Sequence, residues 1–152
     1  MAEKLEIMRQ VVIDLATVFP ELTANEQIYL VPKIMSIDSM APLELQVCES
    51  GVAYPEHDGS CRSENFIVTV GIFRKYRLDS GGRHSKALTD LAVSIFKLKE
   101  TVIDILDGKF LTGALLTRPL IIQTESAVTE TENTGQLLKT LNFIAGLNVE
   151  MT

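Results

Sequence analysis

Two long stretches of strict alternation between apolar and polar residues are the clearest pattern in this chain. They cover Asn65–Arg77 and Leu137–Met151. A period of two is typical of strands, because successive side chains of a strand point to opposite faces of the sheet. At about 3.3 Å per residue the first stretch predicts a strand of roughly 40 Å, well beyond the usual five to six residues.

Two shorter segments also have the character of strands. Leu43–Glu49 alternates apolar and polar residues, and Leu115–Thr124 is mainly apolar. Pro119 points to an edge or a bulge for the second of these, because proline donates no hydrogen bond to a neighbouring strand. The polar segments between the strands, Ser50–Glu64 and Glu125–Gly135, are predicted to be loops.

Apolar residues recur every three or four positions in two further segments, which predicts amphipathic helices over Glu3–Val18 and Ser85–Asp107. Gly108 is placed to end the second helix. Lys99 falls within the apolar stripe of that helix, so either its stem reaches solvent or its ammonium pairs with a carboxylate, in this chain or a neighbouring one. Ile13 falls on the polar side of the first helix, as an ordinary exposed residue or as a subunit contact.

This order of elements predicts an α+β fold in a single domain over residues 1–152. In αββαββ order, we expect a four-stranded, mainly antiparallel sheet with two helices packed on one face. The segment Glu21–Met40 has no clear period, and we expect it to lie over the core as a loop rather than within the sheet.

Composition excludes several classes of protein. The net charge of −6 argues against a general nucleic-acid binder, which normally has a basic face. The apolar runs are shorter than the roughly 18 residues of a membrane helix, so we expect no membrane association. Met1–Gln10 has no apolar core and predicts no secretion signal. Two cysteines, Cys48 and Cys61, are too few for a disulfide framework and are interpreted as reduced thiols of an intracellular protein.

No motif predicts catalysis or ligand binding. His57 and Cys61, with Cys48 upstream, lack the fourth ligand and the paired spacing of a zinc site. A cysteine nucleophile would need His57 or His84 beside it in space, which spacing alone does not predict. The segment Ser80–His84 lacks both glycine-rich phosphate-binding patterns. We therefore expect no catalytic residue, cofactor, metal or small-molecule substrate, and predict that the protein is not an enzyme.

Charge is concentrated in two places. The basic cluster lies at the end of the long strand and beyond it, and it is interpreted either as a solvated strand end or as a docking patch for an acidic neighbour; it consists of Arg74, Lys75, Arg77 and Arg83. The acidic segment Glu125–Glu132 lies among threonines, without apolar neighbours that would raise a carboxyl pKa.

The order and length of these elements resemble the tail-terminator and related head-to-tail joining (neck) proteins of tailed bacteriophages. The resemblance rests on the opening helix Glu3–Val18, the paired strands that end in Phe66–Arg77, the helix Ser85–Asp107 and the closing strand Leu141–Met151. It spans most of the chain and is one of architecture, without a diagnostic motif. Glu21–Met40 departs from it.

The resemblance implies a virion protein that forms a homo-oligomeric ring, usually of six subunits. Such a ring caps the tail tube and joins it to the neck or connector, and DNA passes through it without specific binding. Six copies carry a formal charge of about −36, which repels phosphates. On this basis the channel-facing acids are Glu125, Glu130 and Glu132. Ile13 and the basic cluster are expected to lie in the subunit interface, and the long strand Asn65–Arg77 is expected to extend the sheet of a neighbouring copy.

Two alternatives stay open at this stage. Tail-tube, baseplate-hub and portal-adaptor subunits also form rings, and they differ in their position in the virion. A small intracellular enzyme or ligand-binding domain instead predicts a deep, mostly apolar pocket with converging polar groups.

Overall fold

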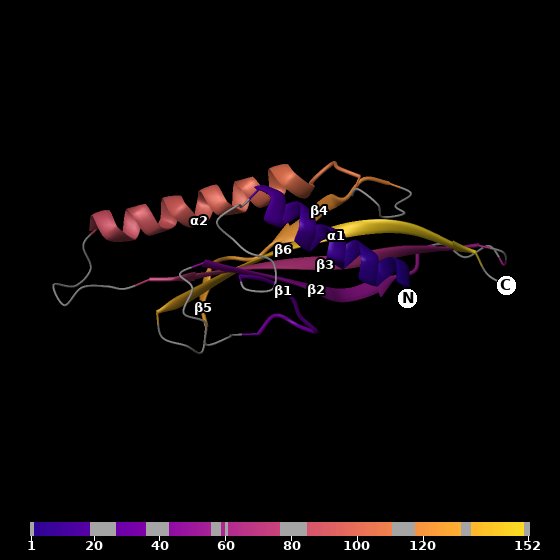
Figure 1. The fold of residues 1–152 in the computed structure, drawn as a ribbon, viewed down its shortest axis with the longest axis horizontal. Coiled ribbons are helices and arrows are strands. Elements are labelled where there is room, and N and C mark those ends of the chain that lie inside the picture. Colours follow the sequence, from indigo (N-terminus) through magenta and orange to yellow (C-terminus); the bar gives the residue numbers. More distant parts are fainter. Residues whose placement is uncertain are drawn as a thin grey trace.

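The computed structural model describes residues 2–18, 27–35, 43–55, 59, 61–76, 85–110, 118–131 and 135–150. Within these ranges two helices lie across one face of a six-stranded sheet (Figure 1). The elements are α1 (Ala2–Val18), β1 (Ile28–Leu30), β2 (Leu43–Ala53), β3 (Cys61–Lys75), α2 (Ser85–Leu106), β4 (Ile121–Glu125), β5 (Thr129–Glu130) and β6 (Gln136–Glu150). The strand order is β1-β2-β3-β6-β4, and β5 also pairs with β6.

The two long strands form the middle of the sheet. β3 pairs with β6 in antiparallel register along its whole length, from Cys61↔Glu150 to Lys75↔Gln136. β2 lies on its other side, from Leu43↔Arg74 to Ala53↔Asn65. Both edges of β3 are therefore taken between residues 65 and 74. The expectation that this strand extends the sheet of a neighbouring copy is wrong for that stretch, because it has no free edge there.

The predicted fold class is wrong in the number, pairing and order of the strands. The described sheet has six strands instead of four, and it is mixed because β1 runs parallel to β2. The order is one helix and three strands, twice, in place of αββαββ. The cause is length: β1 has three residues and β5 has two, too few to show alternation.

The segment Glu21–Met40 was expected outside the sheet, and this is also wrong, because it contains β1. The strand is held at both ends by backbone hydrogen bonds, from the Leu45 N–H to the Gln27 carbonyl (2.8 Å) and from the Val31 N–H to the Val47 carbonyl (2.9 Å). Residues 21–26 and 36–40 lie outside the described residues.

Three predicted boundaries also move. The segment Ser50–Glu64 is not all loop, since β2 continues to Ala53 and β3 begins at Cys61. β2 continues through a bulge between Glu49 and Val52, where Gly51 adopts φ +102°, a conformation that suits glycine. β4 begins only at Ile121, so Pro119 precedes it, and β4 does lie at an edge of the sheet, as Pro119 predicts; residues 115–117 of the predicted strand lie outside the described residues. The predicted loop Glu125–Gly135 contains β5.

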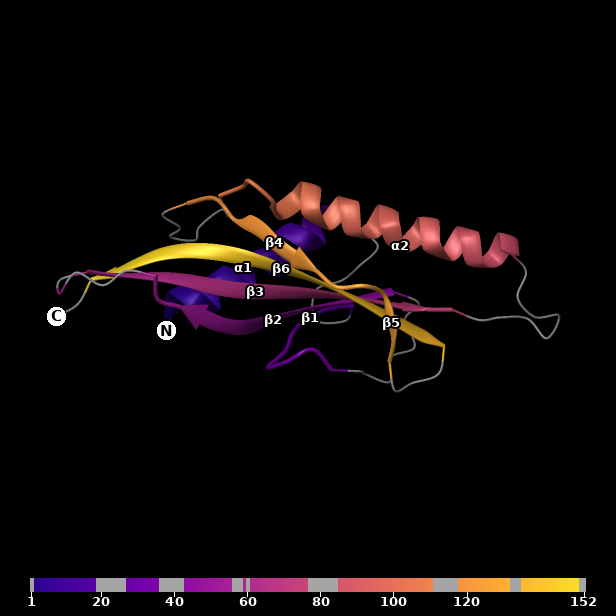
Figure 2. The ribbon, with the colours of Figure 1, turned by 180° about the vertical axis from the view of Figure 1, so that it is seen from behind.

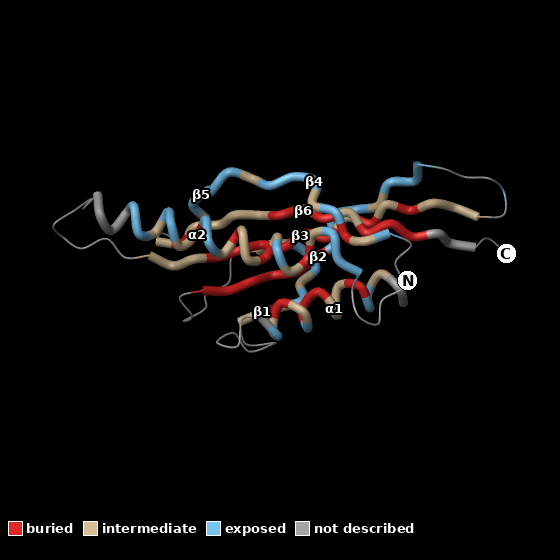
Figure 3. The backbone as a smooth tube through the Cα atoms, turned by 90° about the horizontal axis from the view of Figure 1, so that it is seen from above, coloured by how far each residue is buried: buried red, intermediate tan, exposed pale blue. Residues whose placement is uncertain are grey.

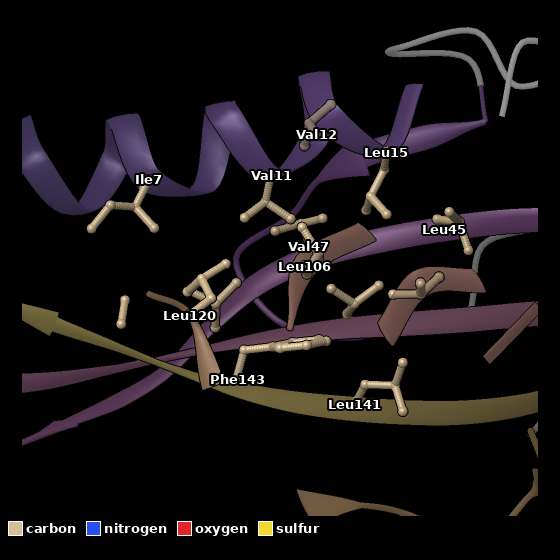
Figure 4. Close-up of a cluster of buried hydrophobic side chains, with 14 of the residues drawn as sticks. Ile7, Val11, Val12, Leu15, Leu45, Val47, Leu106, Leu120, Leu141 and Phe143 are labelled. Atoms are coloured by element: carbon tan, nitrogen blue, oxygen red, sulfur yellow. The ribbon is translucent and has the colours of Figure 1, made fainter. Parts of the chain in front are cut away.

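The hydrophobic core lies between the helices and one face of the sheet, called here the helix face (Figures 3 and 4). Alternate residues of β3 and β6 supply its floor: Phe66, Val68, Val70, Ile72, Leu141, Phe143, Ala145 and Leu147. The helices cover it with Ile7, Val11, Val12, Leu15, Val102 and Leu106. Leu5, which the helical period places with the buried residues, is 37% exposed. In the described part of the chain, neither helix is long and apolar enough to cross a membrane.

The two helices cover different ends of this face. The N-terminal half of α2 lies over the end that carries β5, and α1 lies toward the other end (Figures 1 and 2). α2 ends as predicted before Gly108, which has φ +72° and donates to the Leu120 carbonyl at 2.7 Å. The Asp107 carboxylate accepts a hydrogen bond from the Ile122 N–H (2.8 Å) and so ties this end of α2 to β4.

A buried ion pair fixes α1 to the sheet. Glu64 of β3 lies on the helix face and is fully buried. Its Oε1 lies 2.6 Å from the Lys4 Nζ of α1, and its Oε2 lies 3.1 Å from an Arg62 guanidinium nitrogen. Burial acts to raise the pKa of the Glu64 carboxyl, but the bonds and charges of Lys4 and Arg62 outweigh it and lower that pKa.

The opposite face of the sheet carries a row of polar side chains across four strands. Ser50 hydrogen-bonds Thr69, which donates to the Asn142 Oδ1 (2.6 Å), and the Asn142 amide donates to the Thr124 hydroxyl (2.9 Å). Toward the β5 end of this face, residues 31–35 cover the sheet. The Gln46 side chain hydrogen-bonds the Met35 backbone twice, at 3.0 and 2.8 Å.

Candidate interaction surfaces

An open apolar groove lies between the middle of α2 and the strands below it. Its volume is ≈ 430 Å³. The apolar lining consists of Leu91, Ala92, Ile95 and Phe96 from α2, with Val128 and Leu137 from the β4–β6 region. We call it the α2–β6 groove. Two of its side chains are well exposed, Phe96 at 59% and Val128 at 43%, so the groove presents uncovered apolar surface.

A network of charges lies along the groove and is centred on Lys99. The Lys99 Nζ lies 2.7 Å from the Glu100 carboxylate and 3.6 Å from that of Glu125, and 4.5 Å from the centre of the Phe96 ring. The hydrogen bond to Glu100 is the largest cause that raises the pKa of Lys99; burial opposes it and the Glu125 charge adds to it. Of the two alternatives for Lys99, the structure shows pairing with carboxylates, and both partners belong to its own chain.

The three predicted channel acids have different surroundings. Glu125 shares its carboxylate between Lys99 and Lys139, whose ammonium lies 3.6 Å away and also donates to the Ser126 carbonyl (2.6 Å). Glu130 is exposed on β5. Glu132 lies outside the described residues. Two lysines therefore balance the charge of Glu125, which leaves Glu130 as the more available acid of the two that the structure describes.

A second apolar patch lies on the other side of α2, against α1. Its apolar members are Ile13, Ile105 and Phe110, and its charged members are Asp14, Asp104 and Lys109. We call it the α1 patch. Ile13 is 54% exposed, as its position among polar residues predicts, and Phe110 is 62% exposed. Phe110 is not predicted from the sequence, because it follows the end of α2, outside any periodic segment. Phe96 is not predicted either, because it borders the buried stripe of α2.

The structure separates the members of the predicted basic cluster. Arg74 and Lys75 belong to the paired part of β3, opposite Leu137 and Gln136 of β6. They are partly buried, and the Arg74 Nε is enclosed without a hydrogen-bond partner. Arg77 and Arg83 fall outside the described residues. Arg74 and Lys75 therefore lie within the paired sheet.

The two thiols differ in their exposure. Cys48 is buried, and burial is the main cause that raises its pKa, while Cys61 is partly exposed; neither is in a disulfide in the described part of the chain. No group of three or more histidine, cysteine or acidic residues is placed to hold a metal within the described ranges. His57 and His84, considered above as ligand or base, lie outside them.

Comparison with known proteins gives one kind of likeness, in fold. No protein-family model matches this sequence, and no curated protein matches it. Among solved structures, the chain is similar to a chain in the virion of the native gene transfer agent particle, with a TM-score of 0.51 and 15% sequence identity. The match covers 89% of this chain and 84% of the other. At this identity the comparison shows a shared fold.

Proposed function

We propose that this chain is a structural protein of a phage-like virion, in which copies of it form a ring at the junction of tail and head. The observation that carries the proposal is the fold shared with a chain of the gene transfer agent virion over most of both sequences. The resemblance of the sequence to tail-terminator and neck proteins points in the same direction and gives the position: a ring, of six copies, that caps the tail tube and contacts the neck.

The surface of the subunit supports assembly. Ile13, Phe96 and Phe110 are each more than half exposed, and they gather on two patches instead of being scattered. Soluble monomers rarely expose large contiguous apolar patches, whereas surfaces that bind other proteins do. The described edge strands are short, since β1 has three residues and β4 has five, and each covers only part of the long strand beside it. We place the subunit contacts on the helical layer, because the most exposed apolar side chains of the two patches lie on the helices or directly after them.

The proposed role is structural and needs no catalytic group. In a ring around passing DNA, the net charge of −6 per copy disfavours binding of the phosphate backbone. Of the predicted channel acids we retain Glu130, because it is exposed, and Glu132. Glu125 is the weaker candidate, since Lys99 and Lys139 balance its charge.

Electron microscopy of the purified protein tests the ring. The expected images show closed rings with a central hole, and a uniform monomer in solution contradicts the proposal. The position is tested separately, by deleting the gene from the particle that encodes it. Loss of a tail terminator yields tails of uncontrolled length. Tails of normal length that lack heads, or an absence of tails, would instead indicate that the ring lies at another position in the virion.

A further inference from the structure

The two apolar surfaces of the subunit lie on opposite sides of the same helix. The α2–β6 groove uses Phe96, and the α1 patch uses Ile105, nine residues further along α2. Nine residues are about two and a half helical turns, so these side chains point in opposite directions. In addition, the groove includes Leu137 and Lys139 of β6 and Val128 beside β5, while the patch includes Ile13 and Asp14 of α1.

This placement matters because a closed ring uses heterologous contacts, in which one surface of each subunit binds a different surface of the next. Such a contact requires two separate surfaces that face away from each other. A two-fold dimer requires only one surface that binds its own copy. The described residues offer two, each with at least one aromatic side chain that is about 60% exposed: Phe96 at 59% in the groove and Phe110 at 62% in the patch.

The charges on the two surfaces are complementary. The groove is lined by Lys99, Lys139 and Glu125, and Glu100 pairs with Lys99 beside it, so its two cations are balanced by two anions. The patch is lined by Asp14, Asp104 and Lys109, two anions and one cation. The lysines of the groove attract the aspartates of the patch, and the net negative charge of the patch disfavours its contact with another patch. These charges favour the patch of a second copy as the occupant of the groove.

We propose that the α2–β6 groove of one copy receives the α1 patch of the next copy, with Phe110 and Ile13 packed against Phe96 and Val128. This rests on the proposed ring and specifies the surfaces that close it. The aspartates of the patch then lie near the lysines of the groove. The exposed apolar side chains of both surfaces are withdrawn from water in the same contact, which supplies its main driving force.

Two single substitutions test the contact: Phe96→Asp in the groove and Phe110→Asp in the patch. Both side chains are exposed in the subunit, so each variant is expected to fold, which circular dichroism checks. Each substitution is expected to weaken assembly by about 30-fold or more, as removal of a central aromatic side chain does in other interfaces. The matched control is Val93→Asp, an apolar residue of α2 that is 45% exposed and belongs to neither surface. The control is expected to assemble like the wild type.

Mixing the two variants separates a heterologous contact from any other. The Phe96→Asp protein keeps an intact patch, and the Phe110→Asp protein keeps an intact groove, so an equimolar mixture forms a dimer that cannot grow further. Analytical ultracentrifugation is expected to show monomers for each variant alone and dimers for the mixture. If the wild type forms rings but the variants also do, or if the mixture stays monomeric, the proposed contact is overturned while the ring stands. A monomeric wild type overturns both.

Discussion

The buried pair between Lys4 and Glu64 leads to a prediction whose size follows from the contacts. In the Lys4→Met variant, the Glu64 Oε1 loses the ammonium that lies 2.6 Å from it, while the Oε2 keeps Arg62 at 3.1 Å. Breaking a buried ion pair completely costs about 3–5 kcal/mol. Arg62 remains beside the carboxylate and the Lys4 side chain is 20% exposed, so the loss is expected to fall below that range, at about 2 kcal/mol. For a chain of this size, the midpoint of thermal unfolding is expected to fall by about 4–8 °C.

The stability difference between the wild type and Lys4→Met is expected to depend on pH. The pKa of Glu64 is lowered in the folded protein. Its contribution to stability is therefore complete above the ordinary pKa of a glutamate and is lost as the pH falls through the lowered folded value. The free energy of unfolding of the wild type and of Lys4→Met, measured with urea at equal protein concentration, is expected to differ most at neutral pH. The difference is expected to shrink below about pH 4.

The matched control is Arg9→Met, which removes an ion pair of the same helix. The Arg9–Glu6 pair is 2.9 Å long, but both side chains are more than half exposed, so its loss is expected to change stability by less than about 0.5 kcal/mol. Equal stability of Lys4→Met and Arg9→Met at pH 7 would refute the reasoning, as would a difference that does not change with pH. Either result would mean that Lys4 does not anchor α1 through Glu64.

Two further predictions concern the opposite face of the sheet. A Cβ at Gly71 would lie 2.9 Å from the flexible end of the Ile34 side chain. We therefore expect Gly71→Ala to be tolerated and Gly71→Val to lower the free energy of unfolding in urea by about 1–3 kcal/mol. Ile34→Ala is expected to remove part of that cost, and full additivity of the two substitutions would contradict the contact. Cys48 is buried with a raised pKa, whereas Cys61 is partly exposed. A thiol reagent is therefore expected to modify Cys61 first and Cys48 only on unfolding, which mass spectrometry of the labelled peptides measures. Rapid labelling of Cys48 in the folded protein would argue against its burial.

The sequence predicts the elements whose periodic pattern is long and misses those that are short. Both helices and both 15-residue strands lie close to their predicted positions, because many residues report the same period. β1 and β5 were missed because their pairing partners, not their own side chains, make them strands. The parallel pairing of Ile28 with Leu45 cannot be predicted from the apolar and polar pattern of either segment.

The candidate surfaces show the same division. Exposure of Ile13 and placement of Lys99 among apolar neighbours follow from helical geometry and are found in the structure. The α2–β6 groove does not follow from it, because Phe96, Val128 and Leu137 come from three segments and meet only through the strand order. The environment of Arg74 was also beyond local reasoning, since neighbouring strands on both sides enclose a residue that the sequence places at a strand end.

The row formed by Ser50, Thr69, Asn142 and Thr124 has a consequence for how the sheet finds its correct alignment. A shift of one residue between the two long strands would exchange the faces of every side chain on one of them. Both faces carry large apolar groups, Phe73 on one and Phe143 on the other, so hydrophobicity alone discriminates weakly between the two alignments. In the shifted one the Asn142 amide would enter the apolar layer without its bonding partners. The Asn142 amide therefore destabilises the shifted register of the two long strands. Asn142→Val is expected to leave a population that is more heterogeneous in strand register after refolding.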